Sequence, residues 1–303
     1  MYGTTGPSER DGETEWTTRG AADLPIDLEL IRSRRNPLVG KLRDLHGPRG
    51  RREQGRLLLE GSHLLQEVLQ LGLNPELVLA TPAWLAGHAD LVRALPPETT
   101  LRLATAEVVA AAASTHHPDG VLLTVLPPAA APPTADLTFV LALDRVQDPG
   151  NLGTLLRTAL AAGVQQAWLA EGADPFQPKV LRASSGATLA LPLERLSAAA
   201  LPERLELARR WGLQVVAAVV PQADPGPGRP TAEPYWRIDW CRPTVLLLGN
   251  EGAGLSAELT ALADRRVTIP HSGAVESLNV AVAAAPLLLE RWRQQSEHGG
   301  IVP

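Results

Sequence analysis

From residue 137 onward, the chain alternates short continuous apolar runs with segments whose apolar residues recur every three or four positions. Continuous runs are typical of strands buried on both faces, and the periodic segments are typical of helices with one buried face. We therefore expect a mostly parallel sheet packed between helices. The expected strands cover residues 139–143, 167–170, 213–220, 245–248 and 266–269, and the expected helices cover residues 152–162, 178–185, 202–211, 257–263 and 276–294.

A second, smaller α/β pattern precedes this one. Its expected strands cover residues 56–60, 77–79 and 121–126, and its helix covers residues 62–71. Four prolines fall within residues 127–136, which favours an extended, semi-rigid linker. We expect a flexible tail at 1–25, a small domain at 26–126, the linker at 127–136 and a larger domain at 137–303.

Composition narrows the class of protein. The chain has 303 residues, of which 45% are hydrophobic and 20% charged, a mixture that excludes wholesale disorder. No apolar run predicts a membrane span, and the polar first residues do not resemble a signal peptide. Cys241 is the single cysteine, so neither an intrachain disulfide nor a cysteine zinc site is expected. These features together favour a cytoplasmic location.

The net charge is −5, but positive charge gathers in residues 31–56. That stretch holds nine cations against two acids, Asp44 and Glu53, a local excess of seven. Nearly all the cations are arginines, and guanidinium groups bind phosphates in a bidentate way. The stretch therefore indicates contact with nucleic acid, although a solvated helix face would show the same charges.

One strand–turn–helix segment carries polar groups at its turn. Residues 144–158 read DRVQDPGNLGTLLRT, with Asn151 where a helix N-cap is expected. The expected buried stripe consists of Leu152, Leu155, Leu156, Ala159 and Leu160. Arg157 lies off that stripe. It is either an ordinary surface arginine or a charged group near the carboxyl edge of the sheet, where ligands of open α/β folds bind.

Two more segments have the same form. Residues 248–256 read LGNEGAGLS, and their glycine spacing is not that of a dinucleotide-binding loop. Residues 269–283 read IPHSGAVESLNVAVA and place Ser277 and Asn279 at the mouth of an apolar helix. Helix capping would account for one of these two side chains but not for both.

These three segments resemble motifs 1, 2 and 3 of the SpoU (TrmH-type) RNA ribose 2′-O-methyltransferases, which belong to the SPOUT superfamily. Residues 179–187 resemble the stretch that joins motifs 1 and 2 in that family. Residues 36–45, 59–65 and 117–121 are more loosely similar to its ribosomal-protein-like substrate-binding domain.

The resemblance implies a fold and a set of roles. It implies an α/β chain whose C-terminal parallel-sheet domain contains a trefoil knot, preceded by a smaller α/β RNA-binding domain. It also implies a homodimer, S-adenosylmethionine (SAM) as cofactor, no metal and an RNA substrate. Ribosomal RNA is favoured over tRNA, and guanosine is the commonest target. The implied catalytic residues are Asn151, Arg157, Glu251, Ser277 and Asn279. The implied cofactor-binding residues are Ala218, Gly249, Ile269 and Leu278, and the implied RNA-binding residues are Arg49, Arg51, Arg52 and Arg182.

Two positions depart from the family pattern. His271 stands where methionine is frequent, and we expect it to pack rather than to react. Pro286 lies inside the last expected helix and should kink or break it near Val282. Glu251 is expected to orient either Arg157 or the backbone of motif 3.

Three other functions stay open at this point. A tRNA methyltransferase would carry the same motifs, and a non-catalytic RNA-binding or assembly factor could keep the fold without the reaction. A dinucleotide-dependent oxidoreductase is disfavoured by the glycine spacing.

Overall fold

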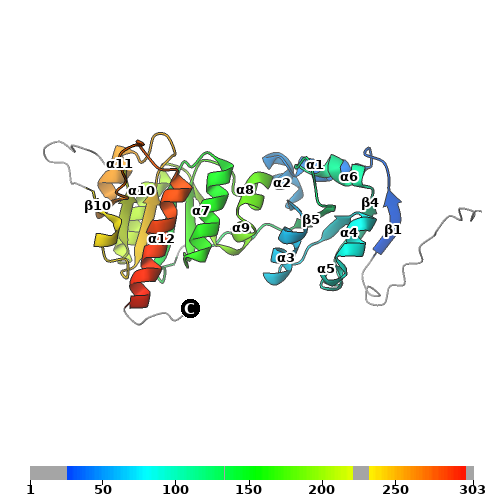
Figure 1. Ribbon diagram of the computed structural model, residues 1–303, viewed down its shortest axis with the longest axis horizontal. Helices are drawn as coiled ribbons and strands as arrows, with labels where there is room; N and C mark the ends of the chain where they lie inside the picture. Colours follow the sequence, from blue (N-terminus) through cyan, green and yellow to red (C-terminus); the bar gives the residue numbers. More distant parts are fainter. Residues whose placement is uncertain (1–25, 133, 221–231, 298–303) are drawn as a thin grey trace, which may run out of the picture.

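The computed structural model of the protein describes residues 26–132, 134–220 and 232–297. The expected tail at 1–25 lies outside these residues. Residues 221–234 contain five prolines, which favour a surface loop, and residues 221–231 of that segment also lie outside. The two sheets lie toward opposite ends of the longest axis, with helices between them (Figure 1).

The N-terminal sheet has five strands in the order β1-β4-β3-β5-β2, and β5 runs antiparallel to both of its neighbours. Its strands are β1 (Ile26–Ile31), β2 (Leu57–Glu60), β3 (Leu77–Ala80), β4 (Thr100–Ala104) and β5 (Val121–Val125). Its helices are α1 (Pro37–Asp44), α2 (Pro48–Gln54), α3 (Ser62–Gln70), α4 (Pro82–Gly87), α5 (Ala89–Arg93) and α6 (Ala106–Ala112).

The C-terminal sheet has seven strands, all parallel, in the order β10-β12-β9-β11-β6-β7-β8. They are β6 (Phe139–Asp144), β7 (Gln166–Ala170), β8 (Leu193–Leu196), β9 (Gln214–Ala218), β10 (Glu233–Pro234), β11 (Thr244–Leu248) and β12 (Arg265–Thr268). The helices are α7 (Pro149–Ala161), α8 (Pro178–Ala183), α9 (Ala187–Ala190), α10 (Ala200–Arg210), α11 (Ala257–Leu262) and α12 (Val280–Glu297), with a 3-10 turn, η1 (Tyr235–Arg237).

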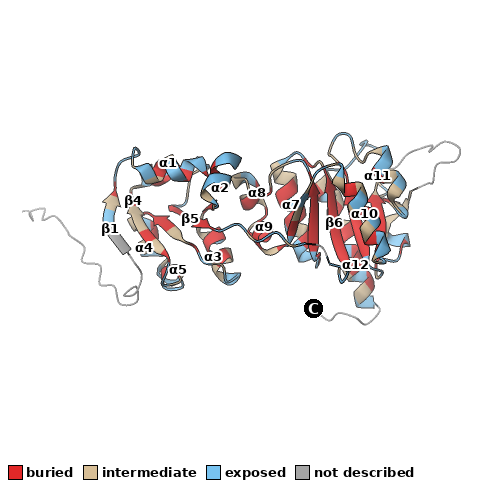
Figure 2. Ribbon diagram, turned by 180° about the vertical axis from the view of Figure 1, so that it is seen from behind, coloured by how far each residue is buried: buried red, intermediate tan, exposed pale blue. Residues whose placement is uncertain are grey.

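Helices cover both faces of this sheet. Leu141 and Leu143 pack with α7 and α12 on one face, and Val140 and Ala142 pack with α10 and α11 on the other. Figure 2 shows the central strands buried between these layers. Burial on both faces explains why these strands read as continuous apolar runs, and it confirms the expected parallel α/β class.

The two domains share apolar packing. Leu181 of α8 and Leu189 of α9 belong to the same buried cluster as Leu59 and Leu64 of the N-terminal domain. Arg51 adds an ion pair across the same boundary, with Nη2 2.6 Å from Oδ2 of Asp174. The α8–α9 segment is therefore in contact with both domains.

Helix boundaries correct two expectations. Helix α7 begins at Pro149 with Asp148 as its N-cap, because the Asp148 carboxylate accepts from the Asn151 N–H at 2.8 Å. Asn151 is thus inside the helix. Helix α12 begins at Val280 rather than residue 276 because the side-chain oxygen of Asn279 accepts from the N–H groups of Ala281 and Val282.

We expected a kink or a break near Val282. Helix α12 runs unbroken through Pro286, so a break there is wrong. Proline removes one hydrogen bond, the one that would end on the Val282 carbonyl. Val282 is 62% exposed, so water has access to that part of the helix. Leu160 also differs from expectation, since it is 39% exposed rather than part of the buried stripe of α7.

Candidate active site

The three motif turns meet at one edge of the C-terminal sheet. They follow β6, β11 and β12, which are parallel, so their carboxyl ends lie on the same side. β6 and β11 are direct neighbours, while β9 separates β11 from β12. Segments that lie more than a hundred residues apart are brought together in this way.

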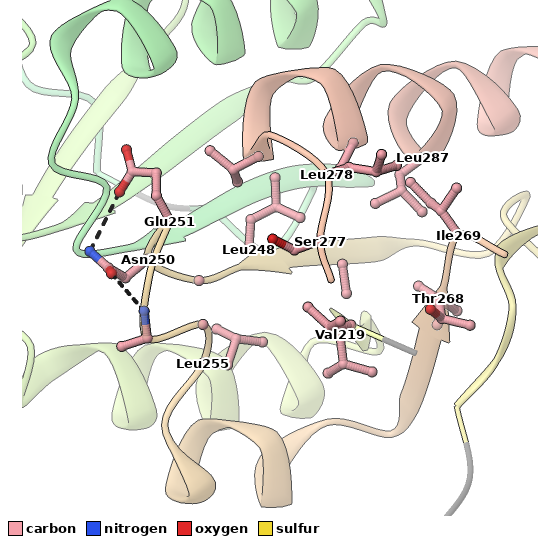
Figure 3. Close-up of a pocket in the computed structure, with 18 of the residues that line it drawn as sticks. Val219, Leu248, Asn250, Glu251, Leu255, Thr268, Ile269, Ser277, Leu278 and Leu287 are labelled. Atoms are coloured by element: carbon pink, nitrogen blue, oxygen red, sulfur yellow. Dashed lines mark hydrogen bonds between the residues drawn. The ribbon is translucent and has the colours of Figure 1, made fainter. Parts of the chain in front are cut away.

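A cavity of about 360 Å³ lies at this edge. It is lined by residues of β9, of the motif 2 turn and of motif 3 (Figure 3). Every residue expected to hold the cofactor lines it, namely Ala218, Gly249, Ile269 and Leu278. Its size is that of a small-molecule site.

The lining fits a ligand with both polar and apolar parts. Leu248, Leu255 and Leu287 supply apolar surface that sequence reasoning did not single out. A Cβ atom at Gly249 would overlap the backbone of Gly254 and Leu255, so only glycine lets this turn close. Within the described residues, the Thr268 hydroxyl is buried without a hydrogen-bond partner. SAM, with an adenine ring, hydroxyls and a charged amino acid end, is compatible with such a site.

Glu251 ties motif 2 to motif 1. Its carboxylate accepts from the backbone N–H groups of Asp148 at 3.0 Å and Gln147 at 3.1 Å. Partial burial by itself raises the pKa of the Glu251 carboxyl, but these hydrogen bonds outweigh it and hold the pKa below its usual value. Glu251 is therefore ionised at neutral pH.

Two amide side chains extend this connection to motif 3. The Asn151 Nδ2 donates to Glu251 Oε1 at 3.2 Å, and the Asn151 Oδ1 accepts from the Asn279 Nδ2 at 2.9 Å. Asn279 in turn caps α12. Glu251, Asn151 and Asn279 thus form one hydrogen-bonded chain, which we call the motif network, through all three turns.

Arg157 is not part of the motif network. It lies on the exposed side of α7, and its Nη1 donates to the Ser185 hydroxyl at 3.0 Å. The hydrogen bonds of Glu251 end on motif 1 and on its neighbour Asn250, so none of them reaches Arg157 directly. The link from Glu251 to the motif 3 backbone is indirect and runs through Asn151 and Asn279. The three turns converge as expected, but Arg157 bonds to Ser185 and Glu251 bonds to motif 1.

Asn250 is a residue that sequence reasoning missed. Its Nδ2 donates to the Arg145 carbonyl at 2.8 Å, and its Oδ1 accepts from the N–H groups of Gly252 and Ala253. Figure 3 shows it beside Glu251 at the rim of the cavity. An asparagine flanked by Gly249 and a glycine-rich turn is the local signal that could have identified it.

His271 and Ser277 line the cavity from the motif 3 side. The two ring nitrogens of His271 lie 3.0 Å from the Ile269 carbonyl and 3.1 Å from the Val275 carbonyl. These contacts hold the turn together, which suits a structural role. Ser277 is exposed at the mouth of the cavity.

The four expected RNA-binding arginines have different environments. Arg49 and Arg52 are exposed on α2, and Arg49 pairs with Glu53. Arg51 is 8% exposed, and its guanidinium donates to the carbonyls of Leu45 and His46 as well as to Asp174. An exposed RNA contact by Arg51 does not fit this burial, because its side chain points into the domain boundary.

Arg182 also lies at the domain boundary. Its Nη1 donates to the Ser114 hydroxyl at 2.6 Å and lies 3.4 Å from Glu60. Its side chain remains about one-third exposed (34%), so one edge is still open to solvent.

The described ranges contain no group of three or more His, Cys, Asp or Glu side chains placed to hold a metal ion. None of the helices they form is both long and apolar enough to cross a membrane.

Comparison with known proteins places this geometry in a family. Residues 138–289 match the SpoU rRNA Methylase family, and residues 36–123 match the MRM3-like substrate binding domain. An uncharacterized tRNA/rRNA methyltransferase of Synechocystis is 44% identical, over 90% of this chain and 96% of that protein. The 23S rRNA (guanosine(2553)-2′-O)-methyltransferase RlmP of Bacillus subtilis is 32% identical, over 86% of this chain and 98% of its own.

Similarity to a solved structure leads to the same family. The AdoMet-bound rRNA methyltransferase from Sinorhizobium meliloti superposes with a TM-score of 0.71 at 30% identity, covering 89% of this chain and 98% of that one. The sequence motifs, the converging turns and these full-length similarities lead to one conclusion. The chain belongs to the SpoU rRNA methylase family.

Proposed function

We propose that this protein transfers a methyl group from SAM to a ribose 2′-hydroxyl of ribosomal RNA. The observation that carries the proposal is the motif network, which joins three separate turns beside a ligand-sized cavity. The relatives, a 23S rRNA guanosine 2′-O-methyltransferase among them, support ribosomal RNA as the substrate and favour guanosine as the target.

The cavity residues hold the cofactor in this proposal. Bound SAM supplies an electrophilic methyl group on a sulfonium. The turn at Gly249, the end of β9 at Ala218 and the segment Ile269–Leu278 would surround it. The motif network keeps those turns at fixed spacing, and fixed positioning supplies much of the rate in a two-substrate reaction.

In this proposal Arg157 contacts the RNA rather than SAM. A guanidinium stays protonated in proteins, so it is not the base that takes the 2′-hydroxyl proton. We assign it to grip the neighbouring phosphate and to stabilise negative charge as it develops on the attacking oxygen. Its exposure on α7 leaves it accessible to RNA. The proton passes to that phosphate or to a water molecule.

Methyl transfer from radiolabelled SAM to total and ribosomal RNA tests the proposal, followed by mapping of 2′-O-methylated positions. We expect the wild type to label ribosomal RNA. Arg157→Ala should keep SAM affinity by calorimetry and lose most methyl transfer. Binding of RNA without any methyl transfer by the wild type would favour an assembly factor, and labelling confined to tRNA would favour the tRNA enzyme.

We also propose that two copies associate through α12. Val282 and Leu289 are 62% and 47% exposed, and their spacing places them on one face of this helix. Exposed apolar side chains that share a face favour a contact between proteins. Val282→Glu with Leu289→Glu should convert a dimer to a monomer by light scattering. A wild type that is monomeric at micromolar concentration would contradict this.

We also propose that the C-terminal domain contains a trefoil knot. The knot is supported by the chain after β12, which lines the same cavity as motif 2 before α12 packs against α7. A crystal structure in which residues 244–297 are traced tests it.

A further inference from the structure

Ser185 has a backbone conformation that its residue type rarely adopts. Its φ is 47°, in the left-handed region that favours glycine. The next residue, Gly186, has φ 83° and is of the type that suits this region. A non-glycine residue in such a conformation costs free energy, and observed strain of this kind is a reason to look for a function.

The Ser185 side chain faces Arg157. Its hydroxyl accepts a 3.0 Å hydrogen bond from the Arg157 Nη1. The preceding Ser184 is different, because it is buried and its hydroxyl contacts Leu181 and Thr188 within its own segment. Of two adjacent serines, one therefore serves local structure and the other reaches the arginine.

The turn that carries Ser185 is held from both sides. On one side, a Cβ on Gly153 of α7 would overlap the Cβ of Ala183, so α7 and α8 are in close contact. On the other side, a Cβ on Gly186 would lie 3.0 Å from the Glu67 Cβ of the N-terminal domain. Ser185 therefore occupies a fixed place between the helix that bears Arg157 and the other domain.

We propose that Ser185 is a positioning residue for Arg157. Its hydroxyl engages one of the five guanidinium N–H groups and leaves the others free for an RNA phosphate. The bond restricts a long side chain before RNA arrives, so less ordering is needed on binding. This inference rests on the proposed function, in which Arg157 acts on the phosphate beside the reacting ribose.

Ser185→Gly tests it, because glycine removes the hydroxyl and relieves the backbone strain. We expect a protein at least as thermally stable as the wild type, with unchanged SAM affinity. The single-turnover methyl-transfer rate at saturating RNA should fall about tenfold, as for loss of one hydrogen bond to a charged group. Ser185→Asn should restore part of the rate, since asparagine tolerates this conformation and supplies an acceptor.

A control variant and a double variant distinguish a positioning role of Ser185 from a purely structural one. Ser184→Ala should lower thermal stability and leave the single-turnover rate of the folded enzyme unchanged. In an Arg157→Ala background, Ser185→Gly should cause no further loss, because it acts only through that arginine.

Failure of the inference differs from failure of the proposed function. A wild-type rate in Ser185→Gly, combined with a large loss in Arg157→Ala, overturns the inference alone. Independent, multiplicative losses in the double variant overturn it too, as does a Ser185→Gly protein that loses stability and SAM affinity together. Full activity of Arg157→Ala removes both the inference and the assigned role of Arg157.

Discussion

Glu251 shows how one side chain can join two turns of a site. Its carboxylate accepts from two backbone N–H groups and one side-chain amide of motif 1, and also from the amide of its neighbour Asn250. An ionised acceptor makes stronger hydrogen bonds than a neutral one. Glu251 is thus best understood as the anchor of the motif 1 turn.

The anchor predicts a defined pH dependence. The folded pKa of Glu251 lies below its unfolded value, so its contribution to stability is present above about pH 4.3, where an unfolded Glu ionises, and is lost as the pH falls through the folded pKa. At pH 7, Glu251→Gln should lower the free energy of unfolding by about 1–2 kcal/mol. Below the folded pKa the two proteins should converge in denaturant titrations.

The exposed Glu258→Gln is the matched control, and its stability should stay within about 0.5 kcal/mol of wild type. If Glu251→Gln lowers the free energy of unfolding by the same amount at pH 3 and at pH 7, the anchoring role is contradicted.

At the scale of elements, α12 tolerates an internal proline. The helix packs Ala284, Leu287 and Leu288 into the core on one side and keeps Val282 exposed on the other. Packing of the buried side stabilises the helix, and the hydrogen bond lost to Pro286 would end on the solvent-facing side. Tertiary contacts therefore outweigh the local preference of proline.

Pro286→Ala should stabilise the protein. The alanine N–H restores the bond to the Val282 carbonyl, and we expect a gain of about 1 kcal/mol in urea unfolding, less than the full helix penalty because proline also restricts the unfolded chain. Ala285→Gly, on the same turn, should cost about 1 kcal/mol. A clear loss of stability in Pro286→Ala would show that packing of the ring matters more than the bond.

For the whole molecule, the domain boundary is built on α8 and α9. These helices contribute Leu181 and Leu189 to the N-terminal core, and Arg51 reaches back to Asp174. The two domains are therefore expected to unfold together.

Arg51 and Arg49, two residues apart on α2, offer a matched pair. Arg51→Ala leaves the half-buried Asp174 without its closest partner, so the free energy of unfolding should fall by about 3 kcal/mol. Arg49→Ala breaks an ion pair whose arginine side chain is 83% exposed and should cost less than about 1 kcal/mol. Equal effects in guanidinium titrations would contradict the assignment of Arg51 to the boundary.

RNA binding is the second property of the whole molecule. Arg49→Glu with Arg52→Glu should weaken ribosomal RNA binding and reduce its salt dependence, because phosphate contacts release counterions. SAM affinity should not change. Arg210→Glu, an exposed site on α10, is the control for charge alone. An RNA affinity unchanged at low salt would exclude α2 from the RNA-binding surface.

The sequence by itself determined the larger fold class and the identity of the three motif turns. Continuous apolar runs and glycine-rich turns are local signals, and a parallel sheet brings the ends of its strands to one edge. Prediction from the sequence was weaker in the N-terminal domain. Strand β4 and the short helices show no clear periodic pattern, and nothing in the sequence indicated that Arg51 is buried.

Tertiary structure alone decided which polar groups meet. Glu251 bonds to motif 1 rather than to Arg157, Arg51 is buried while Arg49 and Arg52 are exposed, and Ser185 reaches Arg157. The physical reason is that a hydrogen bond forms only when a donor and an acceptor from segments far apart in the chain come within roughly 2.7–3.2 Å of each other. Residue type and spacing do not carry that information. The packing of helices and turns within the C-terminal domain supplies the first and third contacts, and the packing of one domain on the other supplies the Arg51–Asp174 contact.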